Sequence, residues 1–195
     1  MPAITGQKGK RCSMAANTDQ KARLFDLQTT VSELLLELVG TTKIPATAGR
    51  FVVSEKFVRD TSQNAPVKIG FIGSNFSKWF FGKVEEPQEE TELRYQKLRK
   101  SSRDIPIINE LGGEEKAETS LTEIYAIMER QKSGEKGVLL TDGHANIFYA
   151  RDINGILRAV DVFWDDWRGL WHVRADGVGS PDGWSGGSRV FSRNS

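Results

Sequence analysis

Cysteine is almost absent from this sequence, since Cys12 is the only one among 195 residues. An internal disulfide is therefore excluded, and so is a zinc site built from several cysteines. Histidine is nearly as scarce, with 2 residues, which argues against a histidine-based zinc site. We expect no cofactor. With one cysteine and no apolar core of a secretory signal after the first basic residues, we expect a cytoplasmic protein.

The sequence also lacks a dominant charge and long apolar runs. Lys and Arg number 27 and Asp and Glu 26, so the formal net charge is +1. This balance argues against a whole-chain electrostatic attraction to nucleic acid or to anionic membranes. No run of roughly 18 apolar residues is present, so we expect no membrane span. The 38% hydrophobic and 27% charged fractions are ordinary for one globular domain.

Residues 1–17 are small, polar and mildly basic through Lys8, Lys10 and Arg11. This composition predicts a flexible basic arm, which is typical of a frayed terminus. The alternative is a short clasp for phosphate or an acidic partner. In that case the protein would be a weak nucleic-acid binder through this arm.

A helical period dominates residues 18–39. The apolar positions recur at intervals of three and four residues, which predicts an amphipathic helix that ends at Gly40. They are Leu24, Leu27, Val31, Leu34 and Leu38. An apolar stripe of this width has to be covered, either by the sheet of the same chain or by a second copy in a homodimer.

The middle of the chain mixes strand and helix signals. Residues 50–58 and 67–72 alternate apolar and polar side chains around a turn-rich connection, which predicts an antiparallel pair of strands. A short helix is expected after Gly73, with Ser74 or Asn75 as its cap. Residues 85–103 run from acidic to basic, a distribution that suits a helix dipole and predicts a largely solvated helix.

A capping box formed by Ser120 and Glu123 predicts a helix whose apolar face begins at Leu121. From Gly137 onward the sequence is typical of an antiparallel meander of about four strands, with a last short strand at 189–191. Three turns are predicted between these strands. They are Asp142-Gly143, Asn154-Gly155 and residues 165–168.

The hydrophobic pattern also predicts a register for the 165–168 hairpin. If the four residues form the loop, Val162 lies opposite Trp171 on an all-apolar face. On the other face, Asp161 lies opposite His172. The preceding hairpin leaves two registers open, which place either Tyr149 or Phe148 opposite Val160.

Tryptophan is concentrated near the C-terminus, where four of the 5 residues lie between 164 and 184. Trp167 falls in a tight charged turn, and Trp184 falls in a glycine-rich loop. Large aromatic side chains on loops are candidates for contacts with a partner, although packing over the sheet edge is the alternative. With the neighbouring Arg168 and Arg174, they form the candidate binding surface.

Two catalytic or metal-binding arrangements are conceivable. The Asp161–His172 pair could orient a general base in a hydrolase-like enzyme, although no partner nucleophile is evident. Asp142, His144 and Asp152 form a weak candidate metal site, which lacks the spacing of a calcium loop. Ordinary cross-strand pairing and turn formation explain the same residues.

Together these features predict an α+β fold, with an N-terminal amphipathic helix and two or three shorter helices packed on antiparallel sheet. We divide the chain into the arm at 1–17, a helix–hairpin–helix segment at 18–112 and a helix plus meander at 113–195, with one continuous core. The function we expect is that of a non-catalytic binding module with an unidentified ligand. A hydrolase and a weak nucleic-acid binder are the alternatives.

Overall fold

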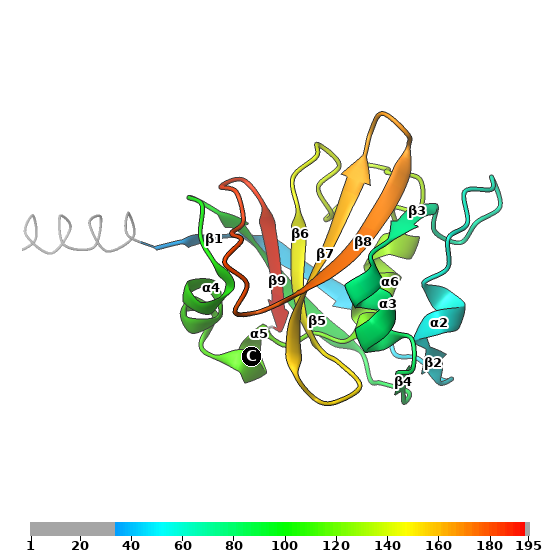
Figure 1. Ribbon diagram of the computed structural model, residues 1–195, viewed down its shortest axis with the longest axis horizontal. Coiled ribbons are helices and arrows are strands. Elements are labelled where there is room, and N and C mark those ends of the chain that lie inside the picture. Colours follow the sequence, from blue (N-terminus) through cyan, green and yellow to red (C-terminus); the bar gives the residue numbers. More distant parts are fainter. Residues whose placement is uncertain (1–33, 194–195) are drawn as a thin grey trace, which may run out of the picture. The chain divides into compact units, whose positions relative to one another are not determined.

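A mixed β-sheet of seven strands organises the part of the chain that the computed structural model describes, residues 34–193 (Figure 1). Residues from Leu35 onward form one unit, and its fold is α+β. The strands are β1 (Leu36–Ile44), β2 (Phe51–Val52), β3 (Ile69–Ile72), β4 (Val84–Glu85), β5 (Thr91–Leu98), β6 (Asn146–Arg151), β7 (Leu157–Asp165), β8 (Leu170–Gly177) and β9 (Arg189–Arg193). The helices are α2 (Val53–Lys56), α3 (Ser74–Phe80), α4 (Asp104–Leu111), α5 (Glu114–Ala117) and α6 (Leu121–Glu129).

The strand order in this sheet is β1-β5-β9-β6-β7-β8-β3, and β2 and β4 form a separate two-stranded sheet. Most neighbours are antiparallel, but β9 runs parallel to β6 and β3 runs parallel to β8. Strand β9 therefore enters the middle of the sheet, between β5 and β6. To reach that position from the end of β8, the chain must cross over a face of the sheet.

Helices cover both faces of the sheet. On the face that we call the α6 face, α2, α3 and α6 pack against side chains such as Phe148, Val160 and Trp171. On the opposite face, which we call the α4 face, α4 and α5 pack against Ile147 and Tyr149. Strand β6 is buried on both faces, which explains why its sequence is nearly continuously apolar. None of the described helices has the length and apolar character needed to cross a bilayer.

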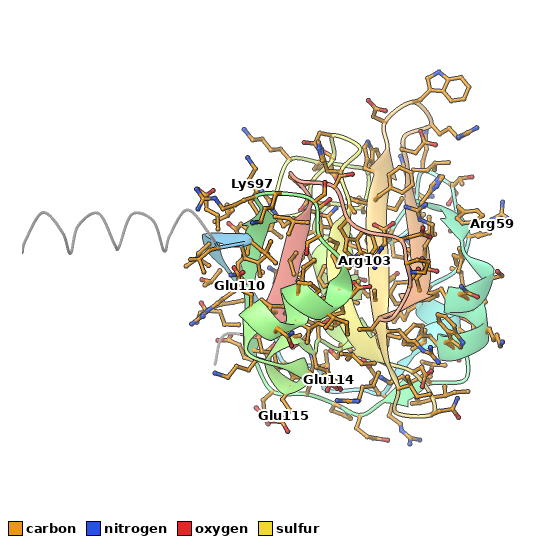
Figure 2. All side chains as sticks on the ribbon, turned by 60° about the vertical axis from the view of Figure 1, so that its left-hand side comes forward. Arg59, Lys97, Arg103, Glu110, Glu114 and Glu115 are labelled. Atoms are coloured by element: carbon orange, nitrogen blue, oxygen red, sulfur yellow. The ribbon has the colours of Figure 1, made fainter. Side chains whose placement is uncertain are left out.

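The connection between β8 and β9, residues 178–188, crosses the α4 face (Figure 1). Its Val178 and Trp184 pack against the apolar cluster beneath α4. Two backbone hydrogen bonds join Trp184 to Ser102, just before α4, with N···O distances of 3.1 and 2.7 Å. The other end of α4 is attached to β1, because the Glu110 carboxylate accepts hydrogen bonds from the Leu35 and Leu36 amides (Figure 2).

Two predicted helices are wrong where the structure describes them. Residues 18–33 of the helix expected over 18–39 lie outside the described part of the chain. From Leu36 onward the chain is strand β1 instead of helix. The helix expected over 85–103 is not formed, and the longest element in this segment is strand β5. Within β5, Leu93 and Tyr95 contribute to the α6 face, which is the period of two expected of a strand. One of the acidic residues that suggested a helix dipole, Glu92, instead accepts a 3.0 Å hydrogen bond from the Thr41 hydroxyl on the neighbouring strand β1.

The predicted pairing of 50–58 with 67–72 is also wrong. Residues 53–56 form α2, and the short β2 before it pairs with β4. The second segment does contain a strand, β3, but this strand lies parallel to β8 and so joins the C-terminal sheet. The helix α3 forms after Gly73 as expected, although Gly73 itself is the N-cap and no side chain caps the helix. The spacing of Val53 and Phe57 fits one helical face as well as a strand.

The C-terminal predictions fare better. The Ser120–Glu123 capping box is present at the start of α6. Strands β6, β7 and β8 form an antiparallel meander, and β9 follows it as the last strand. The Asn154-Gly155 and 165–168 turns connect strands. The element directly before Asp142-Gly143 is the helix α6 rather than a strand, so this predicted hairpin is wrong.

The predicted register of the β7–β8 hairpin is wrong by two residues. Trp164, rather than Val162, lies opposite Trp171, and Asp161 lies opposite Arg174. The turn is shifted toward Gly169, because Asp165 pairs with Leu170. A shift of two residues leaves every side chain on its expected face of the sheet. The hydrophobic pattern therefore predicted the faces of β7 and β8 correctly, although it gave the wrong cross-strand partners.

In the other hairpin, Phe148 lies opposite Val160, so the second of the two open registers is the one formed.

Gly134, which follows α6, is expected to be intolerant of a side chain. Its φ is +76°, and a Cβ there would lie 2.3 Å from the Trp164 indole. Gly155 has the same φ of +76° but no neighbour within 4 Å. Gly155→Ala should therefore cost about 1 kcal/mol from backbone strain alone, and Gly134→Ala about 1–3 kcal/mol more because the core is overpacked. Urea unfolding measures both; equal costs would contradict the close contact with Trp164.

Candidate functional site

Two adjoining cavities lie beneath the 178–188 connection on the α4 face. The first, which we call the acidic cavity, has a volume of about 190 Å³. Its lining includes Asp104, Asp161, Arg174, Asp176, Asp182 and Trp184. The second, which we call the open cavity, has a volume of about 420 Å³, and its lining includes Asp142, His144, Ser185 and Ser188. Arg174, Gly183 and Trp184 line both cavities, so the two meet at these residues.

The alternation of strands β7 and β8 places charged side chains in the acidic cavity. Val173 and Ala175 belong to the core of the α6 face. Arg174 and Asp176 alternate with them along β8 and therefore point to the α4 face. Asp161 lies directly opposite Arg174 on the neighbouring strand. The polar side chains of two adjacent strands therefore meet where α4 and α5 no longer cover the sheet.

Asp161 is a deeply buried charge of the site, with 3% of its side chain exposed. Its Oδ2 accepts hydrogen bonds from Nε of Arg174 at 3.0 Å and from Nη2 of the same guanidinium. Its Oδ1 is buried and has no hydrogen-bond partner among the residues that the structure describes. Burial raises the pKa of Asp161, and the attraction of Arg174 only partly opposes this effect. Arg174 is itself half exposed and lies over the Phe163 ring at 5.1 Å.

Asp104 holds the indole of Trp184 in place. This carboxylate, at the first residue of α4, is 2% exposed. Its Oδ1 accepts a 2.7 Å hydrogen bond from Nε1 of Trp184 and a 3.0 Å hydrogen bond from the Tyr149 hydroxyl. Burial raises the pKa of Asp104, and these two hydrogen bonds moderate the rise. One buried oxygen thus connects α4, the central strand β6 and the crossing connection.

His172 has a different environment from the one predicted. Its Nε2 lies 3.6 Å from Oδ2 of Asp165, near the turn, rather than opposite Asp161. Its ring contacts those of Phe163 and Phe71, with centroids 4.8 and 5.5 Å away. Partial burial lowers the pKa of His172 despite the nearby carboxylate. The cross-strand Asp161–His172 pair that suggested a hydrolase is therefore not formed.

The predicted binding residues fall into two groups. Trp184 and Arg174 line both cavities, whereas Trp167 and Arg168 lie on the β7–β8 turn. Trp167 is 82% exposed, and the Arg168 guanidinium lies 5.0 Å from its ring centre. Arg174 is four residues into β8, about 13 Å from the start of that strand. A small ligand in the cavities would therefore not contact the turn.

The three residues of the weak candidate metal site do not come together as a set. His144 Nδ1 lies 3.1 Å from Oδ1 of Asp142 beside the open cavity. Asp152 instead accepts hydrogen bonds from the amides of Asn154 and Ile156 in the β6–β7 turn, at the other end of β6. Within residues 34–193, no group of three or more His, Cys, Asp or Glu side chains could hold a metal ion.

Sequence reasoning missed Asp104 and Asp176. Asp104 carries the signal of an acidic residue in the first turn of a helix, but no helix was expected over residues 105–113. Asp176 lies one residue before the end of β8 and looks like an ordinary solvated residue. Their roles depend on Trp184, whose position over the sheet cannot be read from local sequence.

Comparisons with protein-family models, with curated proteins and with solved structures found no match for this chain.

Replacing Asp104 tests its structural role. Asp104→Ala leaves the Trp184 indole N–H and the Tyr149 hydroxyl without a partner, and should lower the free energy of unfolding by about 3 kcal/mol. Asp104→Asn keeps an oxygen that can accept both hydrogen bonds and should cost about 1 kcal/mol or less. Urea unfolding followed by tryptophan fluorescence distinguishes the variants. Equal stability of the two would show that the hydrogen bonds contribute little.

The raised pKa values of Asp104 and Asp161 predict a pH dependence of stability. An unfolded aspartate titrates near pH ~3.9. Above that value the unfolded chain has lost the protons of the two carboxyl groups, whereas the folded protein still holds them. The free energy of unfolding should therefore decrease as pH rises through the folded pKa values. Asp104→Asn should flatten this decrease, whereas Asp166→Asn, on the exposed turn, should leave it unchanged. Unfolding curves across this pH range measure the slope, and an unaltered slope in Asp104→Asn would contradict the assignment.

Proposed function

We propose that this protein is a non-catalytic binding module whose ligand occupies the two cavities beneath the 178–188 connection. The observation that carries the proposal is the meeting of both cavities at Trp184 and Arg174. An aromatic wall and a few convergent polar groups are typical of small-ligand sites. Trp167 and Arg168 stay predicted contact residues for a larger partner that also reaches the turn.

The rigidity of the wall supports this proposal. The Trp184 side chain is tied to Asp104, and its backbone is tied to Ser102. A binding surface that is already ordered loses little conformational entropy when a ligand arrives. The site is therefore preorganised on one side, while the exposed Asp182 and Ser185 border its solvent side.

The alternatives have less support. A hydrolase would need Asp161 and His172 to cooperate. Asp161 instead forms an ion pair with Arg174, and the carboxylate next to His172 is that of Asp165. A nucleic-acid interface through the arm, and a homodimer through the 18–39 helix, rest on segments that lie mostly outside the described residues. They stay predictions, as does a cytoplasmic location.

Blocking the open cavity should abolish binding. Ser185→Phe places a large ring at its edge, and Ala48→Phe makes a similar change at an exposed site in the β1–β2 connection. Agmatine, citrate, glucose and adenosine monophosphate serve as probes for a cation, a carboxylate, a sugar and a nucleotide, respectively. The measurement is the melting temperature of each variant with each probe. At least one probe should stabilise the wild type and Ala48→Phe but not Ser185→Phe. The proposal fails if no probe stabilises the wild type, or if Ser185→Phe responds equally.

A further inference from the structure

The acidic cavity carries an excess of negative groups. Asp104, Asp161, Asp176 and Asp182 contribute four carboxyl groups to its lining, and Arg174 is the one cationic side chain among the lining residues. That guanidinium is shared with Asp161, because its Nε and Nη2 both donate to the same oxygen of that carboxylate. An anionic ligand would meet this excess of like charge and would compete with Asp161 for Arg174.

Asp161 gives an independent indication that a hydrogen-bond donor is missing. A buried carboxylate oxygen without a partner is costly, and such oxygens are rare in folded proteins. Oδ1 of Asp161 is in this state, on a side chain that is 3% exposed and lines the cavity. Only a donor can satisfy this oxygen, and a positively charged donor also offsets the cost of burying the charge.

The remaining features of the cavity select the kind of cation. Within the described residues no set of side chains has the arrangement of a metal site, since the carboxyl groups are distributed around the cavity. A group with several N–H donors can reach more than one of them. Trp184 also lines the cavity, and ammonium and guanidinium groups bind favourably over an indole ring. The volume of about 190 Å³ is below that of a typical drug-sized site and suits a head group.

From these observations we infer that the acidic cavity binds an organic cation, an alkylammonium or alkylguanidinium group, between Asp161, Asp176 and the indole of Trp184. This inference rests on the proposed binding function and names its ligand class. The open cavity, which begins on the other side of Trp184 and Arg174, accommodates whatever the cationic group is attached to. The cationic group belongs either to a free small amine or to an arginine or lysine side chain of a peptide.

A pair of probes of equal shape tests the charge requirement. Butylguanidinium and butylurea differ by one charge and have almost the same size. Isothermal titration calorimetry with the full chain should show that butylguanidinium binds at least about tenfold more tightly than butylurea. The difference should shrink as salt is added, because the outer carboxylates are open to solvent.

Matched variants locate the binding. Asp176→Asn removes an exposed carboxylate from the cavity without disturbing a buried pair, and should weaken butylguanidinium binding about three- to fivefold. Asp166→Asn makes the same change of charge on the β7–β8 turn, outside the cavity lining, and should change the affinity by less than about twofold. If both variants weaken binding equally, the cation responds to the overall charge of the protein and the inference is overturned.

The outcomes separate this inference from the proposed function. If butylurea or glucose binds as tightly as butylguanidinium, and Ser185→Phe abolishes that binding, the cation inference is overturned and the binding function stands. If butylguanidinium does not bind, the cation inference is overturned, and the proposed function fails with it only if agmatine, citrate, glucose and adenosine monophosphate also leave the melting temperature unchanged. If butylguanidinium binds as expected, a comparison of agmatine with an N-acetylated, C-amidated Gly-Arg-Gly peptide distinguishes a free amine from a peptide side chain as the source of the cation. Tighter binding of agmatine supports a free amine, and tighter binding of the peptide supports a protein side chain.

Discussion

The buried carboxylate of Asp104 is the interaction on which the site depends. One oxygen atom accepts hydrogen bonds from the Trp184 indole and the Tyr149 hydroxyl, and thereby joins three parts of the fold. The crossing of residues 178–188 over the sheet follows from topology, because β9 must reach a place between β5 and β6. Where that connection lies on the sheet is determined by the hydrogen bonds at Trp184, and both cavities form beneath it.

The site combines a rigid part with a polar part that is not fully satisfied. Trp184 is ordered through its side chain and its backbone, whereas Asp161 retains an oxygen without a partner. Burying such a group lowers stability, and groups of this kind are concentrated at functional sites. The raised pKa of Asp161 has the same origin, since burial disfavours its charged form. A cationic ligand would remove both costs at once.

The accuracy of the sequence-based predictions follows from the range of the interactions involved. The capping box of α6, the Asn154-Gly155 turn and the alternation of β7 and β8 are local, and the structure contains all three. The register of the β7–β8 hairpin needed the position of the turn. A displacement of the turn by one residue changes the register by two residues and places Arg174, rather than His172, opposite Asp161. Strand β5 was mistaken for a helix because the charges of residues 85–103 resembled a dipole pattern, although Leu93 and Tyr95 share one face with the period of a strand.

The sequence by itself determined the α+β class, the two sheet faces of the C-terminal strands and the presence of Trp184 on a loop. These properties follow from side-chain periodicity and turn chemistry, which act over a few residues. Only the tertiary structure decided that Asp104, Asp161, Asp176 and Trp184 surround one cavity. Asp104 and Trp184 are 80 positions apart in the chain and meet through a hydrogen bond that depends on the strand order. Local patterns carry no information about such a meeting, because it depends on how the whole sheet is assembled.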